Sequence, residues 1–250
     1  DGLTEALALA LGLTDAEGDF LAYSVDVLSL TLTRADGTVV ETLPLKSRVD
    51  FAQYTEMTEF VTSAAIPSGV YTSAKMRLDY SAADIQVEDA SGHAVAASVR
   101  DVNGLPITTM EVSVRFDALR RLVIVPGVPA HLTLDFNLQA SNQVDTSAAP
   151  PVVTVEPFLV ADVNPETPKI HRVRGPLKSV NTATSTFRVA IRPFHRVLGE
   201  FGGLSVSTAS DTAFEIDGTA HQGAAGLAQL ALQPTATATV AIGDLDIPNR

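Results

Sequence analysis

Residues 6–13 read Ala-Leu-Ala-Leu-Ala-Leu-Gly-Leu, a strict two-residue alternation near the start of the chain. In a strand, the leucines lie on one face and the small residues between them lie on the other. Alanine and leucine are strong helix formers, but the period of two and the glycine at position 12 favour a strand. A segment this apolar must pair into a sheet, and we expect that sheet to belong to its own domain. The alternative is donation of Ala6–Leu13 to the sheet of a neighbouring molecule.

The remaining chain also favours strands over helices. Short runs with alternating polarity or many β-branched residues recur every ~8–12 residues and are separated by turn signals such as Asp36-Gly37, which is typical of a sandwich or barrel. We therefore predict an all-β fold, with an antiparallel β-sandwich built first along the chain. Its strand-like runs are Tyr23–Thr33, Val39–Leu43, Val70–Tyr80, Ile85–Glu88, His93–Val99, Val112–Phe116, Leu122–Val125, His131–Leu138 and Val152–Val160.

The spacing of apolar residues in one segment predicts a short helix. In Asp50–Ala65, the apolar residues Phe51, Tyr54, Met57 and Val61 recur near helical spacing, although several threonines weaken the pattern. The segment ends at Ile66-Pro67-Ser68-Gly69, which breaks either type of element.

Charge divides the chain into two predicted domains. The net charge is −12, and residues 1–161 carry 21 acidic and 9 basic side chains, whereas residues 162–250 carry 8 of each. Two prolines in a polar run predict a linker over residues 162–169. We thus expect an acidic β-sandwich domain at 1–161 and a small β-barrel domain at 170–250. The strand-like runs of the second domain are Arg172–Val180, Thr186–Ile191, Gly203–Ser207, Ala213–Ile216 and Thr235–Ile242.

The composition also limits partners and compartment. The chain has no cysteine, which excludes disulfides and thiolate sites and is compatible with an exported bacterial protein. No run reaches the ~18 apolar residues of a membrane helix, and residues 1–13 lack the features of a leader sequence. Because the first domain is acidic, we expect no nucleic-acid partner.

Motifs for chemistry are scarce, so we predict no catalytic residue and no cofactor. The sequence contains neither a Gly-x-Ser-x-Gly elbow nor a phosphate-binding loop. The histidines are at least 24 residues apart, which is not a metal-binding spacing. We expect them at the surface or in edge strands, although a hydrolase with a dispersed site would need a pocket that joins histidine and aspartate side chains. They are His93, His131, His171, His195 and His221.

Three charged groups remain to be interpreted, two of them acidic and one basic. Asp15, Glu17 and Asp19 surround Gly18 in a turn, where they would either bind Ca²⁺ or be solvated; the weaker cluster of Asp84, Glu88 and Asp89 is expected to be solvated. The second domain carries a basic set, interpreted as an ordinary charged face or as a surface that docks against the acidic first domain. Its members are Arg172, Arg174, Lys178, Arg188, Arg192 and Arg196.

Several motifs carry a family resemblance. Residues 6–161 resemble a bacterial β-sandwich domain of unknown function that is common on envelope lipoproteins. The matching pieces are Leu13-Thr14-Asp15-Ala16, Val25–Thr33, Val49-Asp50-Phe51 and the strand entry Ile66–Thr72. Residues 170–247 resemble a second family, a small β-barrel repeat, at Gly175-Pro176-Leu177, Phe187-Arg188-Val189 and Thr212-Ala213-Phe214.

The resemblance implies an exported protein that is often attached to the cell surface, with a lipid anchor upstream of this chain, and implies no catalytic set. The expected function is therefore that of a non-catalytic structural or interaction protein of the cell envelope or of the secreted fraction, with protein partners or self-association. One alternative is a self-assembling filament or matrix subunit that donates Ala6–Leu13. A further alternative is a carbohydrate- or calcium-binding surface module, which the absence of tryptophan weakens for carbohydrate.

Overall fold

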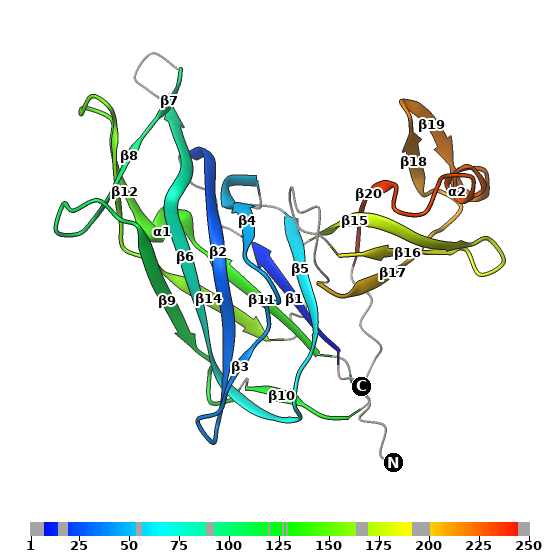
Figure 1. Cartoon of the computed structure of the whole chain (residues 1–250), viewed down its shortest axis with the longest axis horizontal. Coiled ribbons are helices and arrows are strands. Elements are labelled where there is room, and N and C mark those ends of the chain that lie inside the picture. Colours follow the sequence, from blue (N-terminus) through cyan, green and yellow to red (C-terminus); the bar gives the residue numbers. More distant parts are fainter. Residues whose placement is uncertain are drawn as a thin grey trace.

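The computed structural model describes residues 8–14, 20–53, 57–88, 93–119, 121–126, 128, 130–163, 170–191 and 201–244. Strands dominate these residues, which confirms the predicted all-β class. Figure 1 shows two curled sheets that form the larger N-terminal part, and a smaller C-terminal part beside them.

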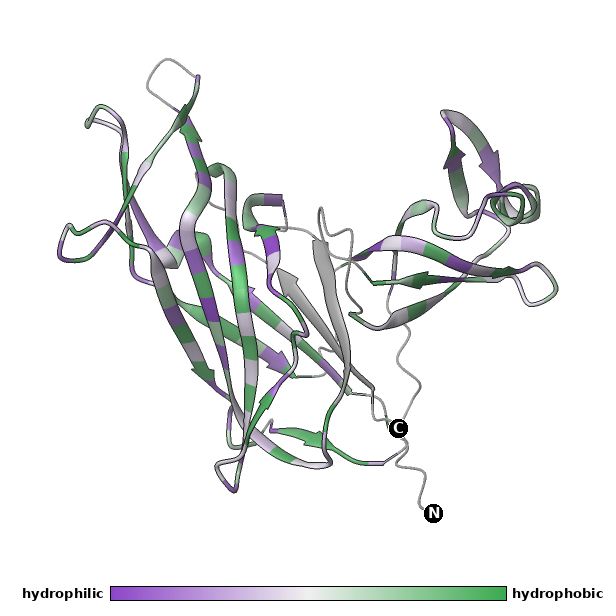
Figure 2. Ribbon diagram, in the orientation of Figure 1, coloured by the Kyte–Doolittle hydropathy of each residue, from purple (hydrophilic) through white to green (hydrophobic). Residues whose placement is uncertain are grey.

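The first sheet, sheet B, is built on two long strands. β2 (Phe20–Arg34) and β6 (Gly69–Glu88) pair antiparallel along most of their length. Side chains alternate between the core and the outer face along both strands, and Figure 2 shows the corresponding change of hydropathy along β6. Shorter strands pair with these two. They are β3 (Val39–Glu41), β4 (Ser47–Asp50), β7 (Ala94–Ala96), β9 (Thr109–Arg115) and β10 (Leu122–Ile124).

The second sheet, sheet A, runs in the order β14-β11-β1-β5-β15-β16-β17, with β20 also paired to β15. Three strands form the β12-β13-β8 sheet beside it, next to the short helix α1 (Leu138–Ser141). Although most pairs are antiparallel, β1–β11, β5–β15 and β8–β13 are parallel. The remaining bounds for the N-terminal part are β1 (Ala8–Thr14), β5 (Met57–Ala65), β8 (Ser98–Asp101), β11 (Ala130–Phe136), β12 (Asn142–Asp145), β13 (Val152–Val155) and β14 (Leu159–Val163).

The N-terminal alternating segment lies inside this sheet. β1 pairs with β11 on one edge and with β5 on the other, so the strand prediction is confirmed over Ala8–Thr14 and the pairing is with its own chain. The pairing with β5 shifts register between Leu11 and Gly12. A glycine inside a strand is where such irregularities are easiest to accommodate.

The predicted helix at Asp50–Ala65 is wrong. Among the described residues of this segment, Phe51–Gln53 forms a single 3₁₀ turn, and the strand β5 begins at Met57. Its β-branched Thr58, Val61 and Thr62 suit a strand, and the place between β1 and β15 gives this strand partners on both edges. The longest helix lies instead at α2 (Gly223–Ala231).

The C-terminal part consists of short strands and α2. β15 (Ile170–Asn181), β16 (Thr186–Ala190) and β17 (Gly203–Ser207) follow one another in sheet A, and β20 (Ala238–Gly243) lies along β15. The hairpin of β18 (Ala213–Ile216) and β19 (Thr219–Gln222) packs with α2. Residues 164–169 of the predicted linker lie outside the described residues, so the proposed domain boundary stays a prediction.

The main core lies between the sheets and is rich in aromatic rings. Tyr23 is fully buried, and its hydroxyl is hydrogen-bonded to the Tyr80 hydroxyl at 3.0 Å and donates to Asn142 Oδ1 at 3.1 Å. Burial raises the pKa of Tyr80, which keeps this hydroxyl neutral. Phe51 and Phe136 extend the cluster with ring centroids 5.1 Å apart.

Aspartates stiffen several turns and bends at the surface. In each case Oδ1 accepts a hydrogen bond of 2.8 or 2.9 Å from the backbone N–H two residues later, the arrangement of an Asx turn. Hydrogen bonds from nearby side-chain and backbone donors, these included, lower the pKa of Asp36, Asp79, Asp101 and Asp145. The set consists of Asp36, Asp79, Asp101, Asp117 and Asp145.

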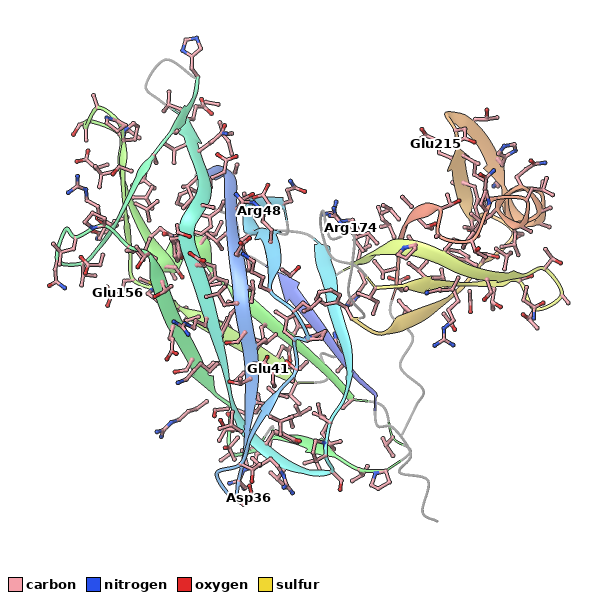
Figure 3. The ribbon with its side chains drawn as sticks, viewed as in Figure 1. Asp36, Glu41, Arg48, Glu156, Arg174 and Glu215 are labelled. Atoms are coloured by element: carbon pink, nitrogen blue, oxygen red, sulfur yellow. The ribbon has the colours of Figure 1, made fainter. Side chains whose placement is uncertain are left out.

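Glu41 ends β3 and braces the end of its pairing with β2 (Figure 3). One carboxylate oxygen, Oε1, accepts from the backbone N–H groups of Leu30, Thr42 and Leu43 at 3.0, 3.2 and 3.1 Å. Replacing Glu41 with alanine is expected to lower the free energy of unfolding by ~1–3 kcal/mol, because the N–H groups of Leu30 and Leu43 lose this acceptor, whereas Thr42 N–H keeps the Leu30 carbonyl at 2.9 Å. Urea denaturation measures the loss. Glu111→Ala, which removes an exposed ion pair with Lys75, should cost less than ~1 kcal/mol; equal losses for the two variants would contradict the bracing role.

Candidate functional site

The strand β15 joins the two parts of the molecule, and the candidate site lies at this junction. Its first residues, Ile170–Arg172, pair in parallel with Met57–Glu59 of β5, and its later residues pair with β16. Sheet A therefore continues from one part into the other through a single strand. Three C-terminal residues belong to the main core and are nearly fully buried, namely Val173, Ile191 and Phe201.

Two buried histidines meet at this junction. His131 on β11 is 1 % exposed and His171 on β15 is 5 % exposed, and their ring centroids are 5.2 Å apart with the rings tilted by 55°. β1 and β5 separate the two strands in the sheet, which in a flat sheet would place them roughly 14 Å apart. The curl of sheet A is what brings the rings together.

Alternation along β11 explains how His131 reaches this position. Leu132, Leu134 and Phe136 point into the main core, so His131, Thr133 and Asp135 lie on the opposite face of the strand. Thr133 Oγ1 is 3.2 Å from His131 Nε2, within hydrogen-bonding distance. The junction face of β11 is thus polar.

The local electrostatics favour a neutral His131. Burial lowers the pKa of His131 to about 4, and the neighbouring His171 contributes in the same direction. At neutral pH the ring can accept or donate a hydrogen bond without carrying charge. Protonation would place a cation in a buried site, next to a second imidazole.

The expectation that the histidines lie at the surface or in edge strands is wrong for His131 and His171. His93 is exposed and His221 on β19 is half-buried, while His195 lies outside the described residues. The sequence signal for the pair was weak. It consisted of a histidine in the strand-like run of β11 and another at the start of β15.

The predicted basic set is divided by the structure. Arg172 reaches the N-terminal part, where its Nη2 donates to Gln53 Oε1 at 3.4 Å, and Figure 3 places Arg174 on β15 between the two parts. Lys178 and Arg188 lie farther along β15 and β16. Arg192 and Arg196 lie outside the described residues. At Arg172 this face thus contacts the N-terminal part.

The candidate calcium turn, Asp15, Glu17 and Asp19, lies outside the described residues, and so does Asp89 of the weaker cluster. Asp84 accepts a hydrogen bond from the Gln86 side chain at 3.0 Å, and Glu88 is exposed at the end of β6. Within the described part of the chain, no group of three or more His, Cys, Asp or Glu side chains is placed to hold a metal ion. Calcium binding therefore stays a prediction.

A polar hollow of about 450 Å³ lies where α2 begins. Gly223, the first residue of α2, has φ of +53°, and a Cβ there would come within 2.6 Å of the Ser210 carbonyl oxygen, so this position requires glycine. The lining offers hydroxyl and amide groups and contains neither histidine nor aspartate. It consists of Ser185, Thr208, Ala209, Ser210, Gln222, Gly223 and Ala224.

Neither described helix is long and apolar enough to span a membrane. Comparisons with protein-family models, with curated proteins and with solved structures found no match to this chain.

Proposed function

We propose that this chain is a non-catalytic structural or interaction protein that works outside the cytoplasm, at the cell envelope or after secretion. The observation that carries the proposal is the junction at β15. A strand that is hydrogen-bonded into both parts, together with the buried Val173, Ile191 and Phe201, resists bending far better than a flexible linker does.

Other features support the same role. The turns braced by aspartate hold the loop ends in fixed conformations, so the body can present its loops to a partner with little loss of entropy on binding. The absence of cysteine suits an exported bacterial protein. The resemblance of residues 6–161 and 170–247 to exported bacterial families supports the proposed location.

Amine labelling of intact cells tests the location. Lys46 and Lys75 have side chains that are 56 % and 51 % exposed. A membrane-impermeant biotin ester is applied to intact cells that produce the protein naturally. If the protein lies on the outer surface, it should be labelled on these cells to the same extent as after lysis. For a periplasmic location, labelling should appear once the outer membrane is permeabilised. Labelling that appears only when a cytoplasmic control protein is also labelled would refute the proposal.

A second candidate function is self-assembly by strand donation, and the position of β1 favours it. β1 is inserted between β11 and β5, parallel to the first and antiparallel to the second. The same strand from a neighbouring copy could make the same backbone pairs in this gap.

Cysteine pairing separates the two sources of this strand. Ala10 lies opposite Ser63, and the natural chain has no cysteine to interfere. The double variant A10C/S63C should form an intramolecular disulfide if β1 stays in its own sheet. If β1 is donated to a neighbouring copy, the single variants A10C and S63C should form covalent dimers when they are mixed and refolded together. The absence of such dimers would exclude strand donation.

A further inference from the structure

The strand β20 forms an uncharged, apolar edge of sheet A. It pairs with β15 from Ala238 to Gly243, and no second strand pairs with it among the described residues. Val240 and Ile242 are each 60 % exposed. Edge strands are usually protected by charge, proline or a bulge, but the sequence Ala-Thr-Val-Ala-Ile-Gly contains neither a charge nor a proline. Such an edge is a template for another strand.

We propose that β20 pairs antiparallel with β20 of a second copy of this chain, about a two-fold axis at Ala241. In this register Val240 lies opposite Ile242 of the second copy, and Ile242 lies opposite Val240 of the second copy. Their exposed side chains would cover one another on one face of the joined strands. A two-fold axis is the commonest symmetry of protein dimers, and the pairing would join both copies of sheet A into one sheet.

Charge favours this surface as the place where two copies meet. Residues 1–161 carry the whole net charge of −12, whereas residues 162–250 are balanced, so copies approach at β20 with less repulsion than elsewhere. Arg174 lies opposite Val240 on β15, and the exposed Asp244 follows β20. In the proposed register Asp244 of the second copy lies opposite Ala238, and β20 separates it from Arg174 on β15. Opposite charges at this separation attract weakly and do not repel, so they are compatible with the pairing.

This inference rests on the interaction role proposed above and names a second copy of the chain as the partner. Sedimentation equilibrium of the full chain, at protein concentrations from about 1 to 100 μM, should show a reversible monomer–dimer equilibrium. Val240→Lys should weaken dimerisation at least about tenfold, because it places a charge opposite an apolar side chain. The far-UV circular dichroism of this variant should match that of the natural chain, since Val240 is already exposed.

A matched control and a cross-link complete the test. Val39→Lys changes a valine that is 61 % exposed on the edge strand β3, and it should leave the dimer intact. Ala241→Cys should form a covalent dimer under mild oxidation, whereas Val39→Cys should not. A natural chain that is monomeric throughout, or a dimer that persists in Val240→Lys, would overturn the inference. A monomer that is still labelled on intact cells would overturn only the β20 interface and leave the proposed location standing.

Discussion

Replacing Tyr23 with alanine is expected to lower the free energy of unfolding by about 3–5 kcal/mol. The Tyr23 ring is fully buried and packs edge-on against Phe20, Tyr80 and Phe136, with centroid distances of 5.0, 6.3 and 6.0 Å. Alanine would leave a cavity at the centre of this cluster. It would also remove the hydrogen-bonding partner that Tyr80 and Asn142 share. Urea denaturation followed by circular dichroism measures the loss.

Two further variants separate the ring from its hydroxyl and from general surface effects. Tyr23→Phe keeps the ring and should cost ~1–3 kcal/mol, through the polar partners it leaves behind. Leu119→Ala removes an aliphatic side chain that is 94 % exposed, and should change stability by less than about 0.5 kcal/mol. A loss for Tyr23→Ala as small as that for Leu119→Ala would show that this cluster is not the centre of the core.

Acidification below about pH 6.5 is expected to destabilise the fold through His131. The pKa of His131 falls from 6.5 to about 4 on folding, because the ring is buried and faces His171. The folded state therefore binds fewer protons than the unfolded chain in this interval. The contribution of the neutral ring to the free energy of unfolding is complete above pH 6.5 and is lost as the pH falls to about 4. This contribution is about 3 kcal/mol.

The slope of stability against pH is the measurement, taken from urea denaturation at several pH values. His131→Gln removes the titrating group and should flatten the slope between pH 4 and 6.5, whatever its effect on absolute stability. His93→Gln, at an exposed position, should keep the natural slope. An unchanged slope in His131→Gln would contradict the assignment. Asp36, Asp79, Asp101 and Asp145 have pKa values lowered below 3.8, so the stability they contribute is lost only at lower pH.

The longer strands β2, β6 and β11 were largely predictable because each has one buried face. In β11 the buried Leu132, Leu134 and Phe136 alternate with more polar residues, and this period is visible in the sequence. Less visible was the continuity of β6, predicted as two runs, because the two halves of one long strand are joined by Ser-Ala-Ala-Asp at 81–84, which has no large apolar side chain. Apolar spacing also misled at Asp50–Ala65, where tertiary pairing of β5 prevailed over the helical period.

The helix α2 was missed because two of its nine residues are glycines, which are poor helix formers. The structure shows why a larger residue does not suit one of these positions. A Cβ on Gly226 would collide with the ring of Phe214 on β18, so the glycine lets the helix pack closely against the hairpin. Leu227 and Leu230 then bury the same side of α2. The residue that approaches Gly226, Phe214, precedes the helix in the chain. The sequence within the helix therefore does not indicate this contact.

The histidine pair was unpredictable for a different reason. His131 and His171 are forty positions apart in the sequence. In sheet A, β1 and β5 lie between the strands that carry them, β11 and β15. Their meeting depends on how strongly sheet A curls, which is a property of the whole sheet rather than of either segment. Similarly, the exposed edge at β20 follows from which strands remain unpaired after the sheet has formed. Alternation identifies strands but does not say which of them lie at an edge.

The place of β1 in sheet A has a consequence for how the chain is made. β1 leaves the ribosome well before its partners, and Leu9 must wait for Ala130, about 120 residues later, before its parallel partner exists. Until then an apolar strand has at most β5 to pair with, and pairs so distant in sequence form slowly. Exposed strands of this kind aggregate easily. A holding chaperone that shields β1 during synthesis would therefore be expected to raise the yield of folded protein.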